Sequence, residues 1–427
     1  FSDYVFTKRY LNELERVSKQ TYLDSIFEEF SRGIRSRSLL LARDYPLYNF
    51  LLDSKNYTYQ NAETLRGILN PFKGVQSYIK NRTNKGLWLQ LANNKTVPME
   101  ILYLTNKTNT KFPIQSLEEY ILGGRNFNTP VSFKDLFFEY DSANHLTDVQ
   151  QDGLSLVYRV LGTSVNRKAK VFPFRAFESN IEEYQKYNSN NTSFKKFNFL
   201  SYENDKKEII FKKGTWTLDK DLIIPQGYTL LANEGTQIDL INSSMIYSYS
   251  PIVFLGTENS LIKVFSSDST GQGITVIKAK RSSLLKYVSF HNLSRPSKGD
   301  WELSGVINFY ESPVSMYETH FEHNISGDDY VNIIRSEFTL NRTSFLHSFA
   351  DALDVDFGKG KIKDYTFMFC GFQGGNGDCL DFSGSLVEID NVFVKNAGDK
   401  GISLGEQSTL SIVNSRMVDI SVWGPPF

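Results

Sequence analysis

The chain has 427 residues, which is long for one ordinary compact core and fits two domains or a domain joined to a solenoid. Its 47 basic and 48 acidic residues give a formal charge of −1. This balance argues against nucleic acid or an anionic membrane as a partner. No stretch approaches the roughly 20 apolar residues that span a bilayer, so we also expect no membrane span.

The first part of the chain carries helical patterns. Apolar residues recur at spacings of three and four over residues 10–30, and similar patterns run over 39–52 and 61–69. These patterns predict a helical segment over residues 1–85.

Residues 86–205 mix two kinds of signal. Strand-like runs occur at 154–160 and 169–174, beside a helical pattern at 178–186. The polar run 187–196 is typical of a linker or exposed loop. We therefore expect an α+β region that ends in a linker, and an N-terminal α/α+β domain over the two segments together.

Beyond residue 206 the texture changes to short β-branched and aromatic runs that repeat. An apolar residue is followed five positions later by another, and the pairs recur about 22 to 31 residues apart. Such a period predicts a mainly β fold, with a right-handed parallel β-helix over residues 206–427. The pairs are Leu285 and Phe290, Met316 and Phe321, Leu340 and Phe345, Ile362 and Phe367, Ile389 and Val394, and Ile412 and Met417.

A second column supports this register. Four successive units carry an aspartate at a turn before a strand, namely Asp329, Asp351, Asp378 and Asp399. Period-two alternation then points Asn332, Asp354 and Asp381 outward, between inward apolar neighbours. Carboxylates about 4.8 Å apart repel by roughly 3.5 kcal/mol at an effective dielectric near 20, so a cation, a donor or a proton must offset the ladder.

Two interpretations of these acidic residues stay open. A turn aspartate can cap the next strand through hydrogen bonds to the backbone, with no substrate involved. Alternatively, the outward side chains line a groove that binds a polysaccharide, either for binding alone or for cleavage by a lyase or hydrolase mechanism. The candidate catalytic residues are Asp354, Asp356, Asp381 and Lys400, and the candidate substrate-binding residues are Arg335, Asp351, Asp378, Asp399 and Glu406.

Two subsidiary expectations concern the same face. Asp354 and Asp381 are candidate ligands for calcium, which prefers carboxylate oxygens. Lys400 and Glu406 could form an acid/base pair, but an ion pair across one turn is the favoured interpretation.

The same region resembles a known family, the β-helix that follows the kinase-like domain in some bacterial CotH-type proteins. The resemblance rests on segments within 207–422, and the helical patterns of residues 8–70 are similar to the segment that precedes this β-helix. It implies a β-helix in a secreted or cell-envelope setting. Nothing in the chain resembles the kinase domain, so no kinase activity is implied. The segments are 221–227 (DLIIPQG), 248–251 (SYSP), 266–273 (SSDSTGQG), 309–313 (FYESP), 332–338 (NIIRSEF), 378–385 (DCLDFSGS) and 398–406 (GDKGISLGE).

We therefore expect an extracytoplasmic β-helix protein that binds a polysaccharide or another surface polymer, with a polysaccharide-cleaving enzyme and a structural spacer as alternatives. Cys370 and Cys379 could pair, but a single bridge is unlike a disulfide framework and we expect free thiols. The last repeat is followed by few residues, so we also expect a β-helix truncated at its C-terminus whose open edge favours end-to-end self-association.

Overall fold

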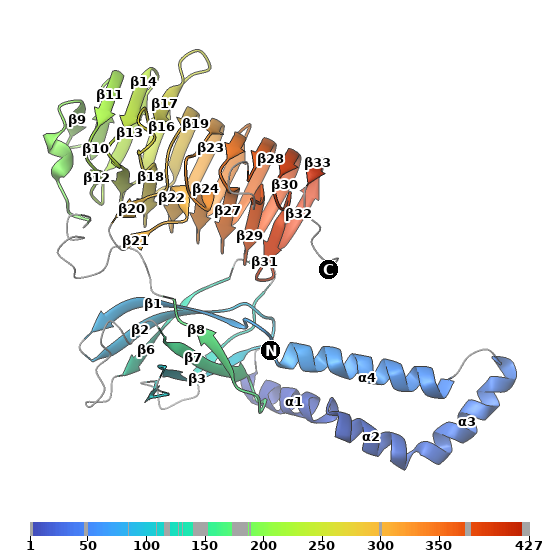
Figure 1. The fold of residues 1–427 in the computed structure, drawn as a ribbon. Coiled ribbons are helices and arrows are strands. Elements are labelled where there is room, and N and C mark those ends of the chain that lie inside the picture. The colour runs from blue at the N-terminus through green and yellow to red at the C-terminus, as the bar shows by residue number, and fades with distance from the viewer. Residues whose placement is uncertain are drawn as a thin grey trace. The chain divides into compact units, whose positions relative to one another are not determined.

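The structure is a computed structural model, and it describes residues 3–46, 50–83, 85–107, 109–114, 120–126, 128–129, 131–139, 153–172, 187, 189–298, 301–371 and 377–420. The chain forms two compact units (Figure 1). The first comprises Phe1–Asn126 with Ser132–Phe174, and the second Phe127–Val131 with Arg175–Phe427. With 49% strand and 16% helix, the fold is mainly β as expected.

The first unit begins with four helices. They are α1 (Tyr4–Val17), α2 (Gln20–Glu29), α3 (Ser31–Asp44) and α4 (Phe50–Leu69). Asp3 caps α1, because its carboxylate accepts hydrogen bonds from two backbone N–H groups of the first turn. Within the described ranges, no helix is long and apolar enough to cross a membrane.

Two antiparallel sheets complete this unit and share one apolar core, to which the helices contribute Leu11 and Leu69. One sheet contains β1 (Val75–Thr83), β2 (Gly86–Asn93) and β6 (Lys134–Glu139). The other contains β3 (Met99–Thr105), β4 (Lys111–Phe112), β5 (Tyr120–Leu122), β7 (Ser155–Val160) and β8 (Arg167–Lys170). The expected helix at 178–186 lies outside the described residues.

The second unit is a parallel β-helix of about nine turns, which confirms the expected fold class. The predicted linker before it is not simply exposed. It contains the short helix η2 (Ser193–Lys196), and Tyr187 and Phe194 are fully buried against the first turns.

Two long sheets run along the β-helix, an eight-stranded sheet and a fifteen-stranded sheet. The eight-stranded sheet contains β12 (Leu222–Ile224), β15 (Ile246–Ser248), β18 (Ile274–Ile277), β22 (Gly305–Tyr310), β24 (Asp329–Ile334), β27 (Asp351–Asp356), β29 (Leu380–Ser383) and β31 (Ser403–Gly405). The fifteen-stranded sheet contains β9 (Leu200–Glu203), β10 (Glu208–Phe211), β11 (Gly214–Leu218), β13 (Thr229–Asn233), β14 (Thr236–Leu240), β16 (Ile252–Leu255), β17 (Ile262–Phe265), β19 (Ser283–His291), β23 (Val314–Glu322), β25 (Glu337–Asn341), β26 (Ser344–Ser348), β28 (Lys359–Cys370), β30 (Leu386–Ala397), β32 (Thr409–Val413) and β33 (Arg416–Ile420).

The apolar pairs expected from the repeat form two continuous columns in the fifteen-stranded sheet. The first members are aligned from Leu285 to Ile412, and the second members from Phe290 to Met417. In an extended strand, residues five positions apart would point to opposite faces. A residue with positive φ two positions after each first member turns the chain and brings both members inward, although Ile412 and Met417 of the last pair remain 40% and 39% exposed. The residues that turn the chain are Tyr287, Glu318, Arg342, Asp364, Asn391 and Asn414.

Two ladders hold the turns together inside. Aromatic rings stack from Phe290 through Phe321 and Phe345 to Phe367, with centroid separations of 5.0, 4.6 and 5.1 Å. Such ring pairs contribute about 0.5–1.5 kcal/mol each beyond their burial. Buried serines mark one corner of successive turns, where the N–H of Ser312 donates to Ser336 Oγ at 2.8 Å and the N–H of Gly358 donates to Ser385 Oγ at 2.9 Å.

The expectation of free thiols is wrong. Cys370 and Cys379 form a disulfide with their Cα atoms 5.3 Å apart, and both side chains are buried. Cys370 ends β28 and Cys379 immediately precedes β29, so the disulfide joins the ends of two strands that belong to different sheets. Their separation of nine residues in sequence did not reveal this proximity.

Candidate functional site

The outer face of the eight-stranded sheet changes its chemistry along the β-helix. One outward column begins with Ile223 and Tyr247, reaches the carboxylates Asp354 and Asp381, and ends at Ser403. The aligned residues are Ile223, Tyr247, Thr275, Asn308, Asn332, Asp354, Asp381 and Ser403. The carboxylates of this column therefore lie on β27 and β29, next to Asn332 on β24.

The first half of this face is covered. Tyr187 and Leu303 pack in an apolar cluster on the outer face of the sheet, to which β15 contributes Tyr247. The antiparallel pair of β20 (Ser297–Lys298) and β21 (Trp301–Glu302) adds a partly buried ion pair, between Lys298 Nζ and the carboxylate of Asp221 at 2.9 Å. The cover thus lies over the apolar part of the column, and the carboxylates come after it.

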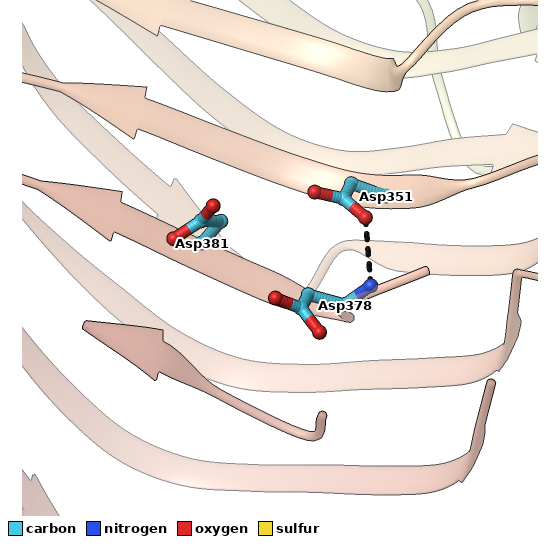
Figure 2. A group of neighbouring side chains, drawn as sticks. All are labelled: Asp351, Asp378 and Asp381. Atoms are coloured by element: carbon cyan, nitrogen blue, oxygen red, sulfur yellow. Dashed lines mark hydrogen bonds between the residues drawn. The ribbon is translucent and has the colours of Figure 1, made fainter. Parts of the chain in front are cut away.

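Three carboxylates from two adjacent turns form the centre of the site (Figure 2). Asp351, Asp378 and Asp381 each offer an oxygen within 4.8 Å of the others. Asp351 Oδ1 accepts a hydrogen bond from the backbone N–H of Asp378 at 2.7 Å. Asp378 Oδ1 accepts one from the N–H of Lys400 at the same distance. These two bonds match the capping interpretation of the turn aspartates.

Asn332 connects the two acidic columns. Its side-chain amide Nδ2 lies 2.8 Å from Asp329 Oδ2 and 2.9 Å from Asp354 Oδ2, so it can donate to both carboxylates. Asn332 is only 1% exposed and Asp329 only 2%. We did not single out Asn332 as functional from the sequence, although its place in the column with Asp354 and Asp381 was visible there.

Burial raises the pKa of several of these carboxyls. The pKa of Asp351 rises to about 8, through burial and the charges of Asp329, Asp378 and Asp381. Burial also raises the pKa of Asp329 to about 7.

The two outward residues of β27 behave in the same way. Burial and neighbouring carboxylates raise the pKa of Asp356 to about 7, against the lowering effect of Arg335. The same causes raise the pKa of Asp354 well above its ordinary value. The pKa of Asp381 is also raised by burial and by Asp378. Carboxyls with such pKa values share protons near neutral pH, so the cluster is less negative than its composition indicates.

The expected exposure of this strip is only partly found. Asp354, Asp356 and Asp381 point outward as alternation predicts, but their side chains are half-buried rather than open to solvent. Asp378 is more deeply buried, at 7% exposure. Half-burial explains the raised pKa values, because it removes water that would stabilise the charged form.

The expected contact between Lys400 and Glu406 is not formed. Lys400 Nζ lies 2.5 Å from the carboxylate of Asp399 and 3.4 Å from that of Asp378. Glu406 instead accepts a hydrogen bond from Ser383 Oγ at 2.7 Å. Strand β31 separates the two residues, so the turn that was expected to bring them together is an extended strand.

Arg335 lies at the other edge of the cluster. Its guanidinium lies 3.4 Å from Glu311 Oε1 and packs over the ring of Tyr310 at 5.8 Å. The structure therefore brings together the acidic residues of three turns. Lys400 lies before the strands of this cluster begin, and Arg335 lies just after β24 ends.

Comparison with known proteins adds little to this geometry. No family model and no curated protein matches the chain, so the CotH-type resemblance stays a prediction. Two similar solved structures are catalytic domains of a GH87 alpha-1,3-glucanase, each an Asp-to-Ala variant in complex with nigerose.

The first of these structures has 10% identity and a TM-score of 0.32, and the match covers 79% of this chain and 62% of the other. The second has 11% identity and a TM-score of 0.29, and covers 75% and 63%. The chain thus spans less than two thirds of the length of either. TM-scores this low carry no conclusion about substrate or site.

Proposed function

We propose that this chain is an extracytoplasmic β-helix protein that binds a polysaccharide along the outer face of its eight-stranded sheet. The observation that carries the proposal is the set of half-buried carboxyls on successive turns, represented by Asp354 and Asp381 in adjacent register. Turns repeat about every 4.8 Å, so an extended polymer would meet similar groups at regular intervals. Carboxyls bind hydroxyl groups both as acceptors and, when protonated, as donors.

The cellular setting is the second part of the proposal. The resemblance to the β-helix of CotH-type proteins supports a bacterial envelope or secreted location. The disulfide between Cys370 and Cys379 supports it independently, because such bonds persist in oxidising compartments. No part of the proposal includes kinase activity.

The acidic cluster favours one class of polymer. Six aspartates lie on or beside three strands, and the nearby cations are Lys400 and Arg335; the six are Asp329, Asp351, Asp354, Asp356, Asp378 and Asp381. A neutral polysaccharide avoids repulsion from this face. An acidic one would need a bridging cation, and calcium bound by Asp351, Asp378 and Asp381 would supply it.

Binding is tested with the full chain against a panel of neutral and acidic polysaccharides, by co-sedimentation with insoluble polymers and calorimetry with soluble ones. We expect Asp354→Asn with Asp381→Asn to weaken binding at least about tenfold, which corresponds to about 1.4 kcal/mol. Asp390→Asn is the matched control, because Asp390 lies on β30 in the other sheet. Equal binding by all three proteins would refute the site.

Calcium is tested in the same assay. We expect added calcium to strengthen binding of acidic polymers, and a chelator to reverse the effect. Binding of neutral polymers should change little. An acidic polymer that binds equally well with and without the chelator would remove calcium from the proposal.

A second candidate function is glycoside hydrolysis, and the raised pKa values favour it. A carboxyl with a pKa near 7, such as Asp356, can act as a general acid while a neighbouring ionised carboxylate acts as base. The test follows the release of reducing ends, together with unsaturated products as the sign of a lyase. Turnover lost in Asp354→Asn or Asp381→Asn supports the enzyme; no turnover on any polymer contradicts it. A chain that neither binds nor cleaves would be a spacer.

A further inference from the structure

Helix α3 is unusual among the helices of the first unit because it buries none of its residues. Three consecutive leucines lie on it with large exposed fractions, 65% for Leu39, 57% for Leu40 and 42% for Leu41. Large apolar side chains grouped on a surface mark a place of interaction.

The same helix is strongly basic. It carries four arginines, Arg32, Arg35, Arg37 and Arg43, against the single acid Asp44. All four are exposed, and among the described residues none of them forms an ion pair. The basic residue in the last turn of α1 differs, because Arg16 pairs with Glu13 at 2.5 Å. The positive charge of α3 is thus left for a partner.

Leucine and arginine share one side of this helix. Arg35, Leu39 and Arg43 follow one another at spacings of four, which places them on the same face. Leu40 lies beside this face, one residue further along the helix. An interacting surface must therefore accept apolar and positively charged groups at the same place.

The position of α3 restricts the shape of that surface. Within the first unit, α3 forms the end of the helical segment that lies farthest from strands β1–β8 (Figure 1). A helix in this position can contact a broad surface or insert its side chains into it. An anionic lipid bilayer has these properties, because its headgroups bind arginine and its acyl boundary accepts leucine.

We propose that helix α3 binds the surface of an anionic lipid bilayer, with Leu39 and Leu40 inserted below headgroups that contact Arg32 and Arg35. The near-zero net charge of the whole chain conceals this local site. An acidic protein or a soluble polyanion would use the arginines but would not need Leu39 and Leu40 to be exposed beside them. The inference is independent of the polysaccharide proposal.

The test is flotation of the full chain with vesicles of phosphatidylcholine containing about 30% phosphatidylglycerol, compared with phosphatidylcholine alone. We expect binding to the anionic vesicles only, weakened by salt because the charges are exposed. Arg32→Gln with Arg35→Gln should reduce affinity about 30-fold, from about 1 kcal/mol per basic residue. Leu39→Gln with Leu40→Gln should reduce it at least about tenfold, since glutamine maintains the helix but not insertion.

The matched control removes two other exposed positive charges of the same unit, by Lys134→Gln with Lys168→Gln, and should bind as the wild type does. Far-UV circular dichroism checks that each variant is folded. Equal flotation with both kinds of vesicle would overturn the proposal. So would unchanged binding by the leucine variant together with full competition by polyglutamate or polyphosphate, because that result defines a polyanion site.

Discussion

Replacing Asp329 by asparagine should make the β-helix less sensitive to rising pH. Asp329 is 2% exposed, and burial raises its pKa from 3.8 to about 7. Asparagine removes the titrating group but can still accept the hydrogen bond from the amide of Asn332, which is 2.8 Å long in the wild type. The variant therefore separates the effect of charge from that of packing.

The sign follows from the two pKa values. Below about pH 4 the carboxyl of Asp329 is protonated in both the folded and the unfolded chain, and its contribution to the free energy of unfolding is at its maximum. Above that pH the unfolded chain loses its proton first, so stability falls until the folded group has also ionised at about pH 7. Between about pH 5 and about pH 8 the free energy of unfolding therefore falls over about two pH units, from about pH 5 to the folded pKa, which corresponds to about 3 kcal/mol.

The assay is amide hydrogen exchange of peptides from β24 and β27, measured at about pH 5 and about pH 8 in the presence of a chelator and corrected for intrinsic rates. Exchange reports on the β-helix alone, which matters in a chain of two units. We expect a pH-dependent loss of protection in the wild type and in the control Asp390→Asn. The loss should be about 3 kcal/mol smaller in Asp329→Asn. The reasoning would be refuted if protection of the wild type stayed constant or rose with pH. It would also be refuted if the protection free energy fell equally with pH in all three proteins.

Three further predictions concern the interior of the β-helix, each measured by urea unfolding followed by far-UV circular dichroism. Removing the disulfide by Cys370→Ser with Cys379→Ser should cost about 3 kcal/mol, and a reductant should affect only the wild type. Phe345→Ala should cost about 3–5 kcal/mol because the ring stacks on both sides, whereas the exposed Leu255→Ala should cost under about 1 kcal/mol. Ser385→Ala should cost about 1–3 kcal/mol, since it leaves the N–H of Gly358 without its acceptor. A loss of less than about 0.5 kcal/mol in any of these variants would contradict its prediction.

The β-helix and its register could be predicted from sequence because stacked turns repeat the same local environment. Apolar residues such as Phe321 and Phe345 recur at matching places, so the period aligns the columns before any contact is known. The same logic placed Asp354 beside Asp381. What the period could not show was why residues five positions apart both point inward, which depends on a positive φ at residues such as Glu318.

Only the tertiary structure decided how deeply the acidic residues lie and which groups they contact. The raised pKa of Asp351 depends on burial and on charges from other turns, neither of which a repeat in the sequence contains. The partner of Lys400 depends on β31 being extended, and the disulfide depends on the end of β28 and the residue before β29 lying close together in space. Periodic features of this chain were thus readable from its sequence, because each turn resembles the next. The chemistry of the candidate site arises where turns differ, and there only three-dimensional proximity determines the outcome.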